Sequence, residues 1–190
     1  MKIILASASP RRRQLLENVG LHDFEIIHPC YEESFSPDAS PEETVCELSR
    51  GKARSVAGAL PGDAVIIAAD TIVYLDGEIL GKPRDELDAC AMLKALSGRE
   101  HRVFTGVTVL RGEREITSFE CTLVRFRELS DREIAAYVQS GESFGKAGAY
   151  GAQGLGALLV ERIEGDYFNV VGLPLCRLAR MLEELGVRLL

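Results

Sequence analysis

Residues 2–20 read KIILASASPRRRQLLENVG, a short apolar run followed at once by the start of a helix. Residues 2–7 are predicted to form a buried strand. Ser9 is a favoured helix N-cap and Pro10 suits the first helical turn, so a helix is predicted from there to Gly20, a typical C-terminal residue. A strand that leads directly into a helix is the repeating unit of α/β folds.

The same alternation of strands and helices continues along the chain. Further strands are predicted at 24–27, 64–69 with 71–75, 103–110, 116–126 and 157–163. Helices are predicted at 40–59 and 130–141, each opened by a capping box, and at 85–96 and 174–184. Because Asp76-Gly77 predicts a hairpin among the crossovers, the fold class is α/β with a mixed sheet flanked by helices.

The composition limits the classes of partner. The 190 residues fit one large domain or a two-lobed one. A hydrophobic content of 46% argues against long disorder, and a formal net charge of −7 argues against a long nucleic acid as partner. Residues 21–48 hold eight acidic residues and no Lys or Arg. The negative surplus lies there, which leaves a local basic site for a small anion open elsewhere.

The cysteines and the apolar runs indicate the compartment. The five cysteines show no C-x-x-C or Cys/His spacing, so neither a zinc site nor a disulfide framework is expected. No apolar run approaches the roughly 20 residues of a membrane span, and the run at 3–6 is too short for a signal-peptide core. We therefore expect a reducing, cytoplasmic setting with no membrane partner.

The first candidate site lies at the strand-to-helix junction, where residues 7–13 read SASPRRR. The free N–H groups and dipole of a helix N-terminus favour an anion, whereas three arginines in the first turn would oppose that dipole. Arg12 stands three and four residues before Leu15 and Leu16, so it leans toward the packed face and needs an anionic partner. Phosphate binding is one interpretation. A solvated basic turn, or an ion pair with the acidic segment, is the other.

The second candidate is Asp70, a carboxylate at the end of the apolar run 64–69. Side chains at strand ends are held rigidly at the edge of a sheet. An Asp in that position can act as a general base or bind a metal ion. It can equally well cap or turn the chain, and the two interpretations have about even weight.

The third candidate is Lys82, whose neighbours depend on the hairpin register. A two-residue turn at Asp76-Gly77 would place Thr71 opposite Lys82, with Asp70 facing the other side. A three-residue loop would instead pair Ile72 with Lys82 and turn Asp70 toward the face of Lys82. The sequence leaves both registers open.

Weaker candidates complete the set. Glu32-Glu33 could hold Mg²⁺, although a solvated loop is the commoner case, and a Lys within a helix, such as Lys52, is usually solvent-facing. Tyr150 and Gln153 in the glycine-rich stretch 141–156 could approach a ligand, although a flexible loop explains the glycines equally well. Basic groups on several segments, a rigid carboxylate and an acidic loop suggest hydrolysis of a nucleotide or another phosphorylated small molecule with a divalent cation.

Four motifs in the chain are LASxSPRR at 5–12, ADTIV at 69–73, LGKP at 80–83 and KAGAYGxQG at 146–154. Together with LSGRxHxV at 96–103 and VVGLP at 170–174, they resemble the Maf family, in this order and over nearly the whole chain. Members of this family are nucleoside triphosphate pyrophosphatases, also named septum formation inhibitors.

The resemblance implies a two-lobed fold over residues 1–190, like that of the inosine triphosphate pyrophosphatases, with an elongated sheet and a cleft between the lobes. It implies cleavage of the α–β phosphate bond of a nucleoside triphosphate with Mg²⁺ or Mn²⁺, giving the monophosphate and pyrophosphate. Asp70 matches the catalytic proton acceptor, and Glu33 and Asp70 would hold the metal. Residues matching positions that would neutralise or bind the triphosphate are Ser7, Arg12, Lys52 and Lys82, with Arg13 adjacent.

Base preference is also implied by the resemblance. Arg11, Thr71 and Gln153 are similar to the set in the subgroup that prefers dTTP and UTP, which implies cleansing of the pyrimidine nucleotide pool. Two residues depart from the usual pattern, because Gly145 replaces a common Asp and Ala152 a common Ile. These departures bear on affinity or metal use more than on the reaction.

Two other interpretations stay open. One keeps the chemistry but prefers 7-methyl-GTP or another purine nucleotide. The other is a regulator of septum formation that binds nucleotide without hydrolysing it. Asp70 disfavours the second, since pure binding gains nothing from a carboxylate beside phosphates. The family resemblance also implies a homodimer.

Overall fold

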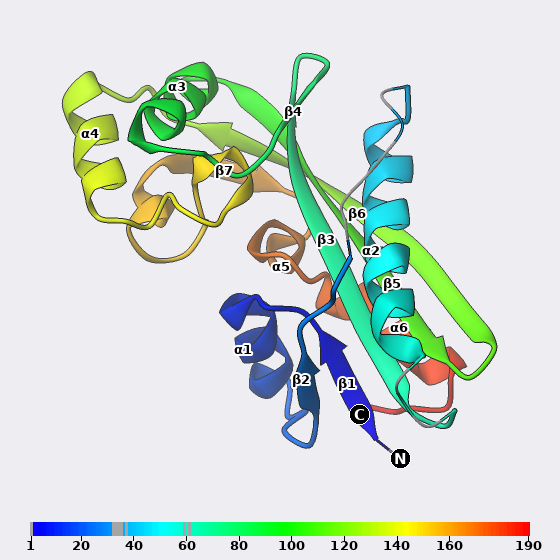
Figure 1. Cartoon of the computed structure of the whole chain (residues 1–190). Helices are drawn as coiled ribbons and strands as arrows, with labels where there is room; N and C mark the ends of the chain where they lie inside the picture. Colours follow the sequence, from blue (N-terminus) through cyan, green and yellow to red (C-terminus); the bar gives the residue numbers. More distant parts are fainter. Residues whose placement is uncertain (1, 32–35, 37, 59, 61) are drawn as a thin grey trace. The chain divides into compact units, whose positions relative to one another are not determined.

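The computed structural model of the protein describes residues 2–31, 36, 38–58, 60 and 62–190 (Figure 1). Its seven-stranded sheet has the order β2-β1-β3-β5-β6-β7, with β4 paired to β3. The strands are β1 (Ile3–Ala6), β2 (Glu25–Ile27), β3 (Val65–Leu75), β4 (Glu78–Leu80), β5 (Glu100–Arg111), β6 (Arg114–Phe126) and β7 (Val160–Glu164). The helices are α1 (Pro10–Asn18), α2 (Pro41–Ala57), α3 (Glu86–Leu96), α4 (Asp131–Gln139), α5 (Tyr167–Val171) and α6 (Leu175–Glu184), with 3₁₀ turns η1 (Ala147–Ala149) and η2 (Gly154–Leu158).

The sheet is mixed, as the sequence predicts. Strand β1 runs parallel to both of its neighbours, β2 and β3. Strands β4 and β7 pair antiparallel with β3 and β6. Helices alternate with these strands along the chain, so the α/β class is confirmed.

The chain divides into two compact units. The first unit comprises Met1–Asp70, Thr105–Glu120 and Gly172–Leu190, and the second comprises Thr71–Phe104 and Cys121–Val171. The divisions fall inside strands β3, β5 and β6, which therefore contribute residues to both units. One of these divisions lies between Asp70 and Thr71.

The first unit has its core between the parallel strands and α2. Figure 1 shows β1 between β2 and β3, and every residue of β1 is buried. Apolar side chains of β1, β3 and α2 form a common cluster, namely Ile4, Ala6, Ala53, Val56, Ala64, Ile66 and Ala68. A continuous apolar strand flanked by parallel neighbours is typical of a sheet covered by helices.

The second unit has a separate core that includes aromatic side chains. Helices α3 and α4 pack together, and their apolar faces meet the strands through Leu93, Ile134 and Val138. Tyr150 and Phe126 lie in the same cluster, with ring centroids 4.7 Å apart in an edge-to-face arrangement. This core supports the segment that follows α4.

Both predicted capping boxes are confirmed. Ser40 Oγ accepts a hydrogen bond from Glu43 N at 3.2 Å, and Glu43 Oε2 accepts one from Ser40 N at 2.9 Å. Ser130 and Glu133 repeat this exchange at the start of α4. Ser9 stands at the N-cap of α1, but its side chain makes no cap bond to the described residues. Instead Ser9 N donates to Ser7 Oγ at 3.1 Å.

Two expectations about the C-terminal third of the chain are wrong. The strand predicted at 157–163 begins only at Val160, because η2 occupies the residues before it. The five-residue helix α5 was not predicted, since so short a segment shows no helical periodicity. Within the described residues, no helix combines the length and apolar composition needed to cross a membrane.

Candidate active site

Asp70 lies within β3, just beyond the point where its parallel neighbour β1 ends at Ala6, while β3 itself continues to Leu75. In the register of β1 and β3, Ala6 pairs with Ala68, so Asp70 follows this pair by two residues on β3. The carboxyl ends of parallel strands meet at one edge of a sheet, and functional groups gather there. Asp70 is only 9% exposed. A carboxylate this deeply buried requires a partner.

That partner is Lys52. The Lys52 ammonium forms an ion pair and hydrogen bond with Asp70 Oδ1, and both side chains are 12% exposed. Helix α2 holds Lys52 in this position because neighbouring residues such as Leu48 and Val56 are buried in the first unit. The expectation that Lys52 faces solvent is therefore wrong. The pair places the Asp70 carboxylate beside a cation that could also contact phosphate.

Arg12 and Ser7 form a second polar group in the first unit. Arg12 Nε donates to the carbonyl oxygen of Gly172 at 2.7 Å, and its Nη1 donates to Ser7 Oγ at 3.3 Å. Ser7 is 4% exposed and directly follows β1. Arg12 thus leans toward the packed side of α1, as its spacing predicts. Both of these acceptors are neutral oxygens.

The other two arginines of the first turn differ in their surroundings. Arg13 is exposed and pairs with Glu17 one turn later, with 2.8 Å between Nε and Oε1. Arg11 is half-buried. An exposed i, i+4 pair is weak, so Arg13 can exchange Glu17 for another anion at small cost.

The acidic loop is described only where it begins. The ring of Tyr31 lies against Gly51 of α2, so closely that a Cβ at Gly51 would come within 2.2 Å of the ring. Lys52 is the next residue of that helix. Glu33, the predicted metal ligand, lies outside the described residues.

The hairpin of the second unit has the two-residue turn. Leu75 pairs with Glu78, and the turn residues Asp76 and Gly77 have φ angles of 49° and 95°, the left-handed values that such a turn requires. Continued along the strands, this register places Thr71 opposite Lys82, beyond the end of β4. The three-residue alternative is excluded. Successive residues of a strand face opposite sides, so Asp70 faces away from the side of Thr71.

The glycine-rich segment is bound to the residue before Lys82. Gly148 N donates to Gly81 O at 3.0 Å, which links the turn η1 to the end of the hairpin. Two residues later the buried Tyr150 shares a hydrogen bond with His101, whose Nε2 lies 2.7 Å from Tyr150 Oη. The second unit thus connects the segments that carry Lys82 and Gln153.

The His101–Tyr150 pair is neutral. Burial lowers the pKa of His101 to about 4 and raises the pKa of Tyr150 well above its ordinary value. Sequence reasoning assigned His101 no role, because it forms no spaced pair with another histidine. The signal that could have identified His101 was its position within the motif at 96–103.

The backbone on each side of Gln153 is held by a hydrogen bond to a side chain. Two residues before it, Gly151 N donates to Tyr137 Oη at 3.3 Å. Two residues after it, Leu155 N donates to both carboxylate oxygens of Glu142, at 3.2 and 3.1 Å. Sequence reasoning missed Glu142, because its partner is a backbone N–H that leaves no pattern in the sequence.

The described residues offer one carboxylate that could serve a metal ion. They contain no group of three or more His, Cys, Asp or Glu side chains placed to hold an ion. Mg²⁺ commonly binds one or two carboxylates and completes its shell with substrate phosphates and water. Asp70 fits such a site as one carboxylate, and a second ligand has to come from Glu33 or the substrate.

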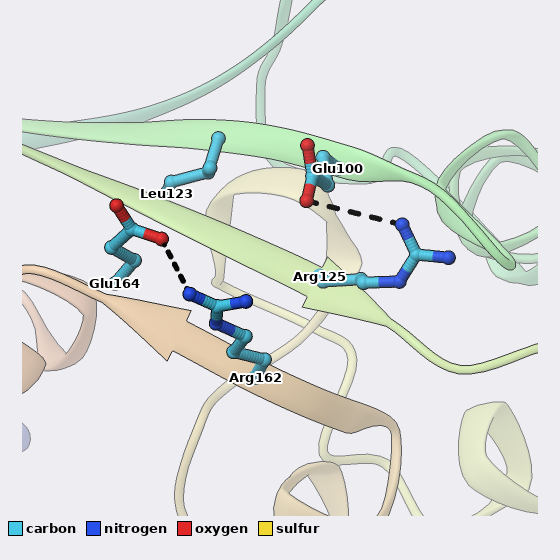
Figure 2. Close-up of a pocket in the computed structure, with 5 residues that line it drawn as sticks. All are labelled: Glu100, Leu123, Arg125, Arg162 and Glu164. Carbon is cyan, nitrogen blue, oxygen red and sulfur yellow. Dashed lines mark hydrogen bonds and ion pairs between the residues drawn. The ribbon is translucent and has the colours of Figure 1, made fainter.

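A shallow pocket elsewhere in the second unit carries none of the candidate residues. Figure 2 shows its lining by Glu100, Leu123, Arg125, Arg162 and Glu164. Arg162 pairs with Glu164 at 2.8 Å, and Arg125 lies 3.9 Å from Glu100. Opposite charges therefore neutralise one another within the pocket, and the candidate site lies elsewhere.

Known proteins resemble the chain over its full length. Residues 2–185 match the family described as Maf-like protein. The dTTP/UTP pyrophosphatase of Thermoanaerobacter sp. (strain X514) is 52% identical, with 100% of both chains covered. That of Carboxydothermus hydrogenoformans is 54% identical (98% of this chain, 100% of the relative), and that of Methanosarcina mazei is 52% identical (98% and 95%).

Solved structures resemble parts of the chain more remotely. A nucleoside-triphosphatase, or dITP/XTP pyrophosphatase, from Mycobacterium abscessus aligns with a TM-score of 0.43 at 20% identity, over 68% of this chain and 76% of its own. The Ham1 protein of Staphylococcus aureus aligns with a TM-score of 0.46 at 15% identity, over 66% and 72%. The family match and the relatives of about half identity show that the chain belongs to the Maf family.

Proposed function

We propose that this protein hydrolyses dTTP and UTP, and related modified pyrimidine nucleotides, to the monophosphate and pyrophosphate. Full-length relatives of about 50% identity that carry the name dTTP/UTP pyrophosphatase support this substrate class. The structural observation that carries the proposal is the buried ion pair between Lys52 of α2 and Asp70 of β3. A nucleotide-cleansing role follows from the reaction.

Asp70 is the general base of the proposed reaction. Water attacks the α-phosphorus, the bond from that phosphorus to the bridging oxygen breaks, and pyrophosphate leaves with the bond electrons. Asp70 accepts the proton that the attacking water loses. Lys52 holds Oδ1, which orients the carboxylate and leaves Oδ2 to receive that proton.

Cationic side chains neutralise the triphosphate. We assign this role to Arg12, Lys52 and Lys82, with Arg13 at the margin. Arg12 is already oriented by its bonds to Gly172 and Ser7, so little conformational entropy is lost when phosphate binds. Oriented cations act where charge develops in the transition state, which is how such groups accelerate phosphoryl transfer.

A divalent cation, Mg²⁺ or Mn²⁺, is part of the proposal. Asp70 and Glu33 would hold it together with substrate oxygens. When bound, the ion would withdraw charge from the phosphate oxygens. Family membership supports this assignment, and the position of Glu33 is a sequence-based prediction.

The base-selective residues are proposed to be Arg11, Thr71 and Gln153. The Gln153 amide offers a donor and an acceptor side by side, which matches the N3–H and O4 edge of thymine or uracil. We also propose that residues 1–190 act as a single two-lobed domain.

Location and assembly follow from the resemblance and the substrate. We propose a cytoplasmic protein, where nucleoside triphosphates are made and consumed, and a homodimer. The five free thiols accord with a reducing compartment. Light scattering during size-exclusion chromatography tests the dimer.

A nucleotide panel tests the function. The protein is incubated with dTTP, UTP, dCTP, dGTP and 7-methyl-GTP in Mg²⁺ or Mn²⁺, and monophosphate, pyrophosphate and phosphate are measured separately. We expect the highest kcat/KM with dTTP and UTP, with pyrophosphate and monophosphate in equal amounts. Release of single phosphate, or a preference for 7-methyl-GTP, contradicts the proposal. Tight nucleotide binding without turnover in either metal would support the regulatory alternative.

A further inference from the structure

Glu142 stands directly after the end of α4. Ser140 is the C-cap of that helix, and Ser140 Oγ accepts a hydrogen bond from Glu142 N at 3.3 Å. Ile134, Tyr137 and Val138 anchor α4 in the core of the second unit. The backbone of Glu142 is therefore fixed to a packed helix, and its side chain is half-buried.

Glu142 contacts both ends of the segment 146–155. At the beginning of the segment, the Lys146 ammonium donates to the carbonyl oxygen of Glu142. At its end, Leu155 N donates to both oxygens of the Glu142 carboxylate. One residue thus holds together the two ends of the ten-residue loop that carries Gln153.

Gly154 shows how closely the carboxylate approaches the backbone. A Cβ at this position would come 2.8 Å from each oxygen of the Glu142 carboxylate. Gly154 also has a φ of 62°, which glycine adopts without strain. Both observations explain a glycine immediately after Gln153, and they place the carboxylate beside the residue proposed to meet the base.

We propose that Glu142 is a positioning residue that fixes Gln153 for discrimination between pyrimidine bases. The proposal rests on the proposed function, because it assumes that Gln153 contacts the base. It adds a residue outside the sequence motifs to the determinants of specificity. Glu142 acts through the backbone of Gly154 and Leu155.

The chemistry of an amide explains why Gln153 needs such a support. A carboxamide carries a donor and an acceptor, and turning it by 180° exchanges them. An unrestrained amide therefore matches the N3–H and O4 of thymine, and equally the N3 and N4–H₂ of cytosine. A fixed backbone holds the amide at one distance and angle from its surroundings, which can then favour one of its two orientations. A loop whose two ends are held together keeps the backbone of Gln153 in one place, whereas a loop with free ends does not.

Three variants test the proposal in the full-length protein. Glu142→Ala removes the carboxylate, Glu142→Gln keeps an oxygen acceptor for Leu155 N–H, and Glu164→Ala is a matched control that removes an exposed, ion-paired glutamate of the same unit. The readouts are kcat and KM for dTTP and dCTP, and the hydrogen-exchange rate of the Leu155 amide. Gln153→Ala is measured alongside.

For Glu142→Ala we expect the ratio of kcat/KM for dTTP over dCTP to fall about tenfold, mainly through a higher KM for dTTP, and the Leu155 amide to exchange about tenfold faster. Glu142→Gln and Glu164→Ala should stay within about twofold of the parent. An unchanged ratio in Glu142→Ala overturns the proposal if Gln153→Ala lowers it. A ratio lost equally in Glu142→Gln also overturns it, because charge would then be the cause. If Gln153→Ala itself leaves the ratio unchanged, the base assignment of the proposed function has failed.

Discussion

The two compact units hold their candidate residues by different means. In the first unit charged groups are central, since Lys52 pairs with Asp70 and Arg12 is fixed by two neutral oxygens. In the second unit the anchors below the glycine-rich segment are mainly neutral, with the buried His101–Tyr150 pair as the centre. The residues proposed to act on phosphate thus stand on packed helices and a strand, whereas Gln153, the residue proposed to select the base, stands on a loop held by hydrogen bonds.

This difference predicts different consequences of mutation. A change in the first unit should alter the chemical step or leave a buried charge unpaired. A change in the second unit should alter substrate affinity and selectivity while the chemical step persists. The experiments below separate the two cases, starting with the largest expected effect.

Asp70→Asn should have the largest effect. The amide keeps the shape of the side chain but cannot take up the proton of water, so kcat for dTTP should fall about 10²- to 10⁴-fold. Pyrophosphate release is the measurement, with circular dichroism to verify that the variant is folded. A variant as active as the parent would remove Asp70 from the role of base.

Lys52→Met should reduce stability as well as activity. It leaves the Asp70 carboxylate buried without its cation, which costs about 3 kcal/mol when a buried pair is broken. Urea unfolding at neutral pH measures this loss. In the double variant Lys52→Met/Asp70→Asn the charge is gone, and most of the lost free energy should return. Equal stability of the parent and the single variant would show that the Lys52–Asp70 ion pair contributes little to the free energy of unfolding.

The low pKa of His101 in the folded protein leads us to expect that the stability of the second unit depends on pH. Its pKa is about 4 in the folded protein, against about 6.5 in the unfolded chain. Between these values only the unfolded chain binds the proton, so the free energy of unfolding falls as pH is lowered from about 6.5 to 4. The total decrease is about 3 kcal/mol.

The comparison that isolates this effect uses His101→Gln. The amide keeps a hydrogen-bonding group near Tyr150 but has no titratable nitrogen in this range. Urea unfolding at pH 7 and pH 4.5 should show a smaller decrease in stability for this variant than for the parent. The same decrease in both proteins would assign the pH dependence to other groups.

Tyr150→Phe should have the smallest effect. It removes one buried hydrogen bond and leaves the ring contact with Phe126, so the expected loss of stability is about 1 to 2 kcal/mol. Because Asp70 belongs to the other unit, KM for dTTP should rise while kcat changes less than about threefold. A fall in kcat alone, with KM unchanged, would contradict the division between the units.

Much of the fold was predictable from local signals. The strand and helix of residues 2–20, both capping boxes and the turn at Asp76-Gly77 depend on nearest neighbours in the sequence, and all are present. The hairpin register, in contrast, could not be predicted from neighbouring residues alone. It depends on how strands β3 and β4 pack, and both registers satisfied the same short sequence.

The candidate site was predictable in part. Asp70 could be identified because it follows the apolar run 64–69, although β3 continues past it to Leu75. Lys52 was misjudged, because the side of α2 that faces Asp70 is decided by packing between distant segments. His101 and Glu142 were missed for a similar reason. Their partners are a hydroxyl 49 residues away and a backbone N–H, and neither leaves a spacing rule in the sequence.

The adjacency of Asp70 and Thr71 has a consequence for how such enzymes diversify. The two are consecutive in β3 and point to opposite sides of the strand, so a substitution at 71 need not disturb the surroundings of the carboxylate. If Thr71 selects the base and Asp70 activates water as proposed, selection can explore new bases at one position while the next preserves the reaction. A lineage with this arrangement can acquire new substrates through single substitutions, without passing through an inactive intermediate.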